Sequence, residues 1–402
     1  MRRRFPTLTP TLSQKGRRAF LQSVCGCAAL GAGSVFGSGL GARMAPGFRP
    51  EKASDEFSLW DTFEKEEQKL KRSRFLIRDP ELNAYVHGVA CRVAGDFCRD
   101  LRIYLVRSPY FNATMAPNGM MQIWSGLLLR MANEAQLAAM IAHEIAHYLE
   151  RHGVERLRDA RSRSALGQLV SLALSPVALV GGALGSVVLG SAAHLGIATG
   201  GLAYRRDHER EADRIGVELM AQAGYAPMEA ARVWTQLREE REAGGTREPG
   251  LLFASHPPAE ERERSLTEFS SGKDEGRIGA EAYRAALAPH RTLFLQDEVQ
   301  RRRFGETMAL LERLLKSAPT DGELWFFRGE ACRLRAEPGD AEGALQAYRA
   351  ARDLPGAPPE VHRSMGLVLQ RVGRTKEASS AFLRYLDLRP AGVDAELLRT
   401  YL

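Results

Sequence analysis

Cysteine is scarce in this chain: there are five in 402 residues, and three of them, Cys91, Cys98 and Cys332, lie beyond residue 45. Their spacing does not resemble a zinc ribbon or the disulfide framework of a small secreted domain, which disfavours both kinds of scaffold. Cys91 and Cys98 are seven residues apart. On one continuous helix that is about 10 Å along the axis, which is too far for a disulfide bond. A bridge between them requires the helix to end near Gly95.

Acidic residues are absent from the first 45 positions, which carry seven lysine and arginine residues. The rest of the chain has 49 basic and 49 acidic residues, so the formal net charge of +7 belongs to the N-terminal segment. A nucleic-acid-binding protein keeps its basic excess on the folded domain, and we therefore expect no nucleic-acid partner. Hydrophobic residues make up 44% of the chain and charged residues 26%, a composition that buries the cores of two or three globular domains.

Residues 1–45 have the composition of an export signal peptide. A basic start is followed by a mildly apolar stretch rich in glycine and alanine, and small residues near positions 41–45 suit a signal peptidase. The pair Arg17 and Arg18 resembles a twin-arginine signal. An ordinary secretory signal with a basic start is the alternative. Both predict export, and the expected location is the periplasm or another part of the cell envelope.

Charge is also missing between Ser164 and Tyr204, where no aspartate, glutamate, lysine or arginine occurs. The stretch is long enough to span a membrane, but Pro176 and a Gly-Gly pair at 181–182 divide it into shorter pieces. We expect a buried or groove-covering helical hairpin. The alternative is that residues 165–203 contact a membrane surface.

The remaining pattern indicates a mainly α-helical fold with a small β-sheet. Residues 57–96 have a helical pattern, broken at Asp79 and Pro80. Residues 101–106 (LRIYLV) and 120–124 (MMQIW) are rich in strand-forming side chains and predict two strands.

A long helix follows the strands and contains the sequence AAMIAHEIAHYLERHG. Asn133 suits the N-cap, with Gln136 at the capping-box position, and Gly153 is expected to end the helix. His143 and His147 lie one turn apart on one face, where two imidazole nitrogens can bind one Zn²⁺ ion. Glu144 points slightly away, as a general base acting on water beside the metal must do.

A zinc site needs a third protein ligand, and the charged segment HEREADRIG at residues 208–216 is the richest source. Glu209 and Asp213 share one helix face, so that one could bind the metal while the other fixes the tautomer of a histidine ligand. His208 and Glu211 are the alternatives.

The C-terminal part, residues 280–402, contains an internal repeat. Glycine, alanine, aromatic and proline positions recur at the 34-residue tetratricopeptide spacing, as in Gly366, Ala378, Phe382 and Pro390. A preceding unit fits with a small insertion: Trp325, Gly329, Ala344, Tyr348 and Ala351. Such helix pairs stack into a solenoid, and its concave surface is expected to bind peptides or protein partners.

These motifs together resemble the HtpX/BepA/Oma-type zinc metallopeptidases, relatives of the CAAX prenyl endopeptidases within the gluzincin group. The similarity extends over about residues 57–390 and rests on HEIAH, the later Glu-x-x-Ala-Asp, the segment NATMAPNGMMQIWSGLL at 112–128, and Ser-His-Pro at 255–257. It implies a gluzincin-type metallopeptidase domain over residues 46–270 and an α-solenoid of tetratricopeptide repeats over 280–402.

The resemblance also implies roles for single residues. His143, His147 and Glu209 become the ligands of one zinc ion, Glu144 the general base, and Asp213 a partner of a histidine ligand. His256, in Ser-His-Pro, becomes a candidate fourth ligand or plug of the site. The donor to the oxyanion stays open among three residues: His256, Arg262 and Tyr204.

The expected function is a zinc endopeptidase of the cell envelope that cleaves misfolded or stalled exported proteins, with the repeats recruiting substrate or partner. A substrate peptide is expected to lie as an extended strand beside residues 112–124, because backbone pairing recognises peptides with little regard to sequence. The alternative is a chaperone or assembly factor that uses the same fold with its metal site closed by His256.

Overall fold

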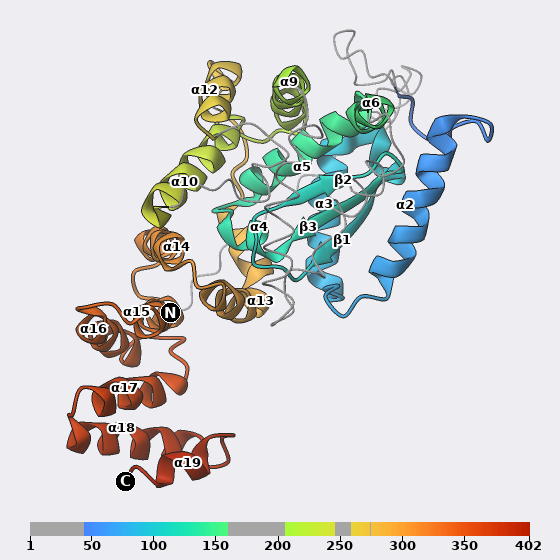
Figure 1. Cartoon of the computed structure of the whole chain (residues 1–402). Helices are drawn as coiled ribbons and strands as arrows, with labels where there is room; N and C mark the ends of the chain where they lie inside the picture. Colours follow the sequence, from blue (N-terminus) through green and yellow to red (C-terminus); the bar gives the residue numbers. More distant parts are fainter. Residues whose placement is uncertain (1–43, 160–205, 246–258, 274) are drawn as a thin grey trace, which may run out of the picture. The chain divides into compact units, whose positions relative to one another are not determined.

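The computed structural model describes residues 44–159, 206–245, 259–273 and 275–402 (Figure 1). Several expectations fall outside these residues: most of the signal peptide, the uncharged stretch 165–203, and the side chains of Tyr204 and His256. Within the described part of the chain, no helix has both the length and the apolar composition needed to cross a membrane.

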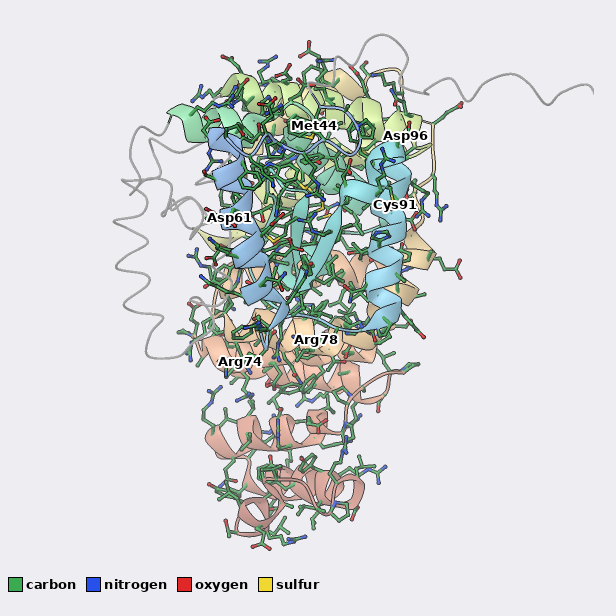
Figure 2. All side chains as sticks on the ribbon, turned by 90° about the vertical axis from the view of Figure 1, so that its right-hand side faces the viewer. Met44, Asp61, Arg74, Arg78, Cys91 and Asp96 are labelled. Carbon is green, nitrogen blue, oxygen red and sulfur yellow. A yellow bond between two sulfur atoms is a disulfide. The ribbon has the colours of Figure 1, made fainter. Side chains whose placement is uncertain are left out.

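Two helices come first, α2 (Asp55–Lys71) and α3 (Pro80–Ala94). The expected break at Asp79 and Pro80 is confirmed: the Asp79 side chain caps α3 by accepting a hydrogen bond from the Leu82 amide, and Pro80 occupies the first turn, where its missing N–H costs nothing. Figure 2, where Asp61 marks α2 and Cys91 marks α3, shows the strands between these helices in that view.

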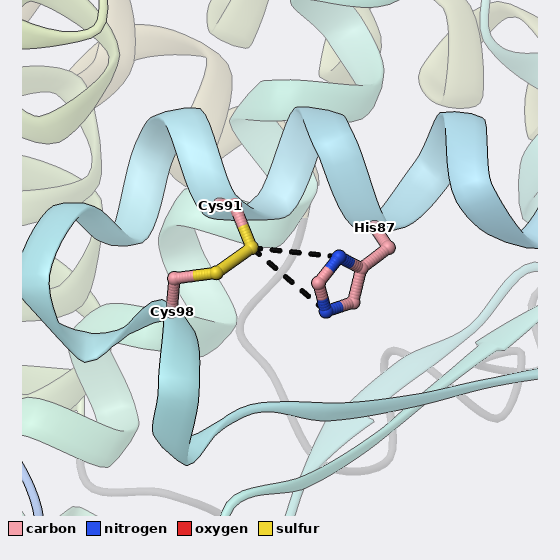
Figure 3. The surroundings of a disulfide bond; sticks show 3 residues. All are labelled: His87, Cys91 and Cys98. Atoms are coloured by element: carbon pink, nitrogen blue, oxygen red, sulfur yellow. Dashed lines mark hydrogen bonds between the residues drawn. A yellow bond between two sulfur atoms is a disulfide. The ribbon is translucent and has the colours of Figure 1, made fainter.

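The helix α3 stops at Ala94, and Gly95, with φ of 54°, turns the chain into the short 3₁₀ helix Gly95–Asp100. The helix therefore ends where a disulfide between Cys91 and Cys98 requires it to end. The Cα atoms of Cys91 and Cys98 come within 4.7 Å and their sulfur atoms are bonded. His87, one turn before Cys91 on α3, places its Nδ1 3.5 Å from the Cys91 sulfur (Figure 3).

The described residues form a three-stranded sheet of order β1-β3-β2. Both expected strands are confirmed, as β1 (Arg102–Val106) and β3 (Met120–Trp124), and they pair in parallel. The edge strand β2 (Ala113–Met115) pairs antiparallel with β3 and is too short for its pattern to stand out in the sequence. All five residues of β3 are buried, as expected for a central strand covered on both faces.

After α4 (Ser125–Arg130), the chain enters α5 (Glu134–Leu149). Its N-cap is Asn133, as expected, and the Asn133 side chain accepts a hydrogen bond from the Gln136 amide at 2.9 Å. The expectation that Gly153 ends this helix is wrong. The chain turns at Arg151, which has φ of 60°, and Gly153 lies inside the next helix, α6 (His152–Asp159). There a Cβ would lie 3.2 Å from the Pro117 ring, so Gly153 serves close packing.

Three further helices complete the first part of the described chain, namely α9 (Arg206–Gln222), α10 (Met228–Gly244) and α12 (Ala259–Ser270). The helix α9 packs against α5, and α12 packs against both α9 and α10. Gly216 permits the close approach of α9, because a Cβ at that position would lie only 3.2 Å from the backbone nitrogen of His143.

The C-terminal helices are α13 (Ala280–Gln300), α14 (Phe304–Ser317), α15 (Gly322–Arg335), α16 (Asp340–Arg352), α17 (Glu360–Arg371), α18 (Thr375–Leu388) and α19 (Ala395–Arg399). One contact recurs in them. A Cβ on Gly329 of α15 would lie 2.4 Å from the Tyr348 ring of α16, and a Cβ on Gly366 of α17 would lie 2.4 Å from the Phe382 ring of α18. Two successive helix pairs therefore use the same glycine-to-ring packing.

Candidate metal centre

Two histidines of α5 and one glutamate of α9 meet in the interior. His143 Nε2 lies 3.1 Å from His147 Nε2 and 3.6 Å from Glu209 Oε2, and His147 Nε2 lies 3.3 Å from Glu209 Oε1. All three side chains are nearly inaccessible, with exposed fractions of 3%, 2% and 1%. The Glu209 carboxylate, buried in a dry interior, needs a nearby cation or a proton to offset its lost hydration, and the guanidinium of Arg262 is one such cation, with its Nη1 3.7 Å from Glu209 Oε2.

The spacing of these atoms fits a metal ion. Tetrahedral ligands at about 2.0–2.1 Å from Zn²⁺ lie about 3.3–3.4 Å from one another. The two imidazole nitrogens are 3.1 Å apart, and each has one oxygen of the Glu209 carboxylate at 3.3 or 3.6 Å. Two imidazoles and one carboxylate are a donor set that suits zinc. His143, His147 and Glu209 could therefore hold such an ion.

The other face of His143 is supported by α9 and α12. Its Nδ1 lies 3.0 Å from Asp213 Oδ1, and Arg262 Nε donates to Asp213 Oδ2 at 3.0 Å. The Arg262 guanidinium also stacks on the Trp234 ring, 4.0 Å from its centroid. Burial opposes ionisation of Asp213, but the positive charge of Arg262 and the contact with His143 hold the pKa of that carboxyl below its usual value.

His147 is supported by different residues. Its Nδ1 lies 2.9 Å from His152 Nδ1, and His152 Nε2 lies 3.0 Å from Glu211 Oε2. Burial lowers the pKa of the His152 imidazole. His208 and Glu211, the alternative third ligands, are therefore accounted for elsewhere: Glu211 contacts His152, and His208 Nε2 lies 3.2 Å from Glu155 Oε2.

Glu144 is buried beside the ligands, and its Oε1 has no hydrogen-bond partner among the described residues. Burial, followed by the negative charge of Glu209, raises the pKa of Glu144 to about 8. A bound divalent cation acts in the opposite direction and favours the carboxylate. The nearby Met115 backbone amide favours the charged form of Glu144, which places the carboxyl beside the edge strand β2.

Arg262, an open candidate for the oxyanion donor, lies against the ring of His143. Its Nη2 is 2.8 Å from His143 Nδ1 and 3.3 Å from His143 Nε2. Sequence reasoning missed two supporting contacts, the stacking of Trp234 on Arg262 and the link from His147 through His152 to Glu211. His152 does follow the motif at short range, but nothing in the spacing identifies its partners.

A second cluster of metal-binding residue types also occurs in the described chain, at His87, Cys91 and Cys98. Both of its sulfur atoms belong to the disulfide, so neither is available as a thiolate ligand. The buried cluster on α5 and α9 is thus the stronger candidate centre.

Residues 76–270 match the sequence profile of peptidase family M48, and this range contains the buried cluster and its supporting residues. The chain carries a peptidase M48 domain. This match confirms the family expected from the motifs. Members of the family are zinc-dependent metallopeptidases, and the buried cluster offers a possible metal site.

Several curated proteins are similar to this domain. The Escherichia coli (strain K12) protein named beta-barrel assembly-enhancing protease is 26% identical over 204 residues, which are 48% of this chain and 40% of that protein. A Vibrio cholerae protein that carries the same name provisionally is 30% identical over 196 residues, again 48% of this chain and 40% of that protein. Mitochondrial metalloendopeptidase OMA1 of Schizosaccharomyces pombe is 32% identical over 168 residues, 42% of this chain and 46% of that protein. The chain thus aligns with less than half the length of each relative.

Proposed function

We propose that this chain is a zinc-dependent endopeptidase with His143, His147 and Glu209 as metal ligands and Glu144 as the general base. The observation that carries the proposal is the buried set of two imidazoles and one carboxylate whose ligand atoms lie within 4.8 Å of one another, with the carboxyl of Glu144 beside them. The M48 domain and the names of its relatives support the same activity. Asp213 holds His143 from behind in this proposal.

The zinc ion, when bound, supplies a Lewis acid that makes water a nucleophile near neutral pH. Glu144 then accepts the proton of the attacking water and delivers it to the amine nitrogen as the peptide bond breaks. Because the Glu144 carboxyl is buried, bulk water has little access to the proton that it carries between the two steps.

A peptide substrate is proposed to extend the sheet at β2. In the described part of the chain, β2 pairs with β3 on one side only. The Met115 amide points to the other side, where it meets Glu144. A peptide added along this edge would lie beside the general base, and backbone pairing would bind it with little sequence preference.

The proposed cellular role is degradation of misfolded or stalled proteins in the cell envelope, after export by the N-terminal signal. One relative supports this setting by its name, beta-barrel assembly-enhancing protease, and the name of the other, mitochondrial metalloendopeptidase, supports the peptidase activity. The repeated contact of Gly329 with Tyr348 and of Gly366 with Phe382 supports tetratricopeptide repeats over 280–402, which would recruit substrate or partner beside a peptidase domain over 46–270.

The test is cleavage of unfolded casein by the exported, processed chain, together with its zinc content. The wild type should bind one zinc ion and cleave. Glu144→Gln should keep the zinc and lose at least about 100-fold in rate, and Glu209→Ala should lose the zinc. Glu218→Ala is the matched control, because Glu218 is a carboxylate of the same helix that pairs with Arg214.

Equal cleavage by the wild type and Glu144→Gln would contradict the enzymatic proposal. Stoichiometric zinc without cleavage in either protein would instead favour the second function, a chaperone or assembly factor whose metal site is closed by His256.

A further inference from the structure

His152, the first residue of α6, is a fully buried histidine with an exposed fraction of 0%. Each of its ring nitrogens faces one partner. Its Nδ1 lies 2.9 Å from Nδ1 of His147, and its Nε2 lies 3.0 Å from a carboxylate oxygen of Glu211. The three side chains therefore form a continuous chain from α5 through α6 to α9.

The proposed ligation determines where the protons of this chain lie. If His147 Nε2 gives its lone pair to a metal, its Nδ1 carries the hydrogen and must donate. His152 Nδ1 is then the acceptor, and a neutral imidazole with one acceptor nitrogen carries its hydrogen on the other. His152 Nε2 therefore donates to Glu211. The opposite arrangement would place a hydrogen on His147 Nε2 and prevent ligation.

We infer that His152 is a positioning residue of the metal centre: it accepts the hydrogen bond of His147 Nδ1–H, and Glu211 fixes the tautomer in which it can do so. The inference rests on the proposed function, because it takes His147 as a ligand. His152 does not bind the metal itself. It holds the His147 ring in the orientation that aims Nε2 at the ion.

Helix α9 supplies residues that orient both histidines of the centre. Glu209 is the proposed ligand, and the same helix supplies support for both histidines. Asp213 reaches His143 Nδ1 directly, at 3.0 Å. Glu211 reaches His147 only through the interposed ring of His152. One helix thus orients the whole centre.

One face of the His152 ring is covered by a second histidine, His208. His208 stacks on it with a centroid separation of 4.2 Å and an interplanar angle of 9°. His208 in turn lies 3.2 Å from Glu155, a residue of α6. The left-handed conformation of Arg151 ends α5 and starts α6 at His152, which turns the ring back toward His147.

If His152 only fills space, its substitutions should affect zinc binding differently than if it accepts a hydrogen bond from His147. Three variants separate these two roles. His152→Phe keeps a flat ring of similar size and removes both nitrogens. His152→Asn keeps an acceptor oxygen at the position of Nδ1, whereas His152→Gln places its amide at the position of Nε2.

The experiment measures the zinc dissociation constant of each full chain by competition with a chelator, and the thermal unfolding of each apoprotein. We expect His152→Phe and His152→Gln to bind zinc about 10–100-fold more weakly than the wild type. His152→Asn should stay within a few-fold of the wild type. Glu211→Ala should weaken binding less than His152→Phe, and combining both changes should add little. Glu218→Ala, on the same helix, should bind as the wild type does.

Two outcomes would overturn the inference: His152→Phe binding zinc as tightly as the wild type, or Asn and Gln variants of equal affinity. The comparison of Asn with Gln remains decisive even if Phe destabilises the apoprotein, because both amides remove the ring. Failure of the proposed function looks different: without the zinc ligation the wild type itself would bind no stoichiometric zinc, and without the enzymatic activity it would bind zinc but cleave no better than Glu144→Gln.

Discussion

At the scale of single residues, Arg262 is the buried cation of the centre. It pairs with Asp213, stacks on Trp234 and lies against His143. Removing one partner of a buried ion pair leaves the other charge without compensation, which typically costs about 3–5 kcal/mol.

We therefore expect Arg262→Leu to lower the free energy of unfolding of the apoprotein by about 3 kcal/mol, as measured by denaturation in urea. The double variant Arg262→Leu, Asp213→Leu should recover part of that loss, because it leaves no lone charge. A double variant less stable than Arg262→Leu alone would show that the ion pair itself is not what Arg262 contributes.

A second residue, Glu67 of α2, lies outside the candidate metal centre and should make the stability of the fold depend on pH. Its carboxylate accepts hydrogen bonds from Arg102 Nε at 2.8 Å and from the Tyr104 hydroxyl at 2.6 Å. Burial opposes the charge, but these partners lower the pKa of Glu67 from 4.5 to about 2. A carboxyl whose pKa is lower in the folded than in the unfolded state stabilises the folded state at pH values above its unfolded pKa. This stabilisation is lost as the pH falls from 4.5 toward 2.

Glu67→Gln should thus be less stable than the wild type at pH 7, by up to about 3 kcal/mol, and the difference should shrink on acidification. Urea denaturation at a series of pH values measures it. Glu66→Gln is the control, because in the described part of the chain Glu66 forms a surface ion pair with Lys69, and its effect should be within about 0.5 kcal/mol. A difference between Glu67→Gln and the wild type that is independent of pH would contradict the assignment.

The sequence predicts the residues of the centre unevenly, for a physical reason. His143 and His147 share one helix, so helical periodicity alone places their rings together. Glu209 lies on another helix, and only the family resemblance chose it over His208 and Glu211. The link through His152 depends on where α6 turns back, at Arg151, and no local pattern encodes that turn.

At the scale of elements, the packing of α9 on α5 sets the distance between Glu209 and the two histidines. Gly216 makes this packing possible, since a Cβ there would lie 3.2 Å from the His143 backbone nitrogen. Gly216→Ala should push the helices apart, destabilise the fold by about 1–3 kcal/mol and weaken zinc binding several-fold, as measured by chelator competition.

Gly88→Ala is the matched control for this prediction. Gly88 also lies inside a helix, α3, but a Cβ there would meet only the Arg92 guanidinium at 4.0 Å. Helix propensity then dominates, and the variant should gain about 0.5–1 kcal/mol. If Gly216→Ala were stabilised in the same way, the close approach of α9 would not govern the centre.

Elements with strong local signals were predictable, and those fixed by packing were not. The start of α3 follows from Asp79 and Pro80, and the Cys91–Cys98 bridge follows once the helix ends before Gly95. The end of α5 was mispredicted, because Gly153 is a glycine required by contact with Pro117 and not by backbone conformation. The short edge strand β2 exists only through its pairing with β3.

At the scale of the whole molecule, a buried cluster of charges connects the M48 domain to the C-terminal helices. Arg130 of α4 donates to Glu240 of α10 at 2.7 Å and to Glu298 of α13 at 3.0 Å. Arg313 of α14 donates to Glu240 at 2.7 Å. Because four helices share these bonds, we expect the domain and the first C-terminal helices to unfold together.

Arg130→Met tests this coupling. Among the described residues it leaves Glu240 paired with Arg313 and Glu298 paired with Arg301. Part of the charge stays compensated, so the fold should lose about 3 kcal/mol, the low end for a broken buried pair. Amide hydrogen exchange should accelerate together in α10, α13 and α14, because opening of one element exposes the buried carboxylates of the others. Arg349→Met, which removes a surface pair with Glu342, should leave exchange in these helices unchanged. Faster exchange confined to α13 and α14, with α10 as in the wild type, would show that the C-terminal helices open independently of the peptidase domain.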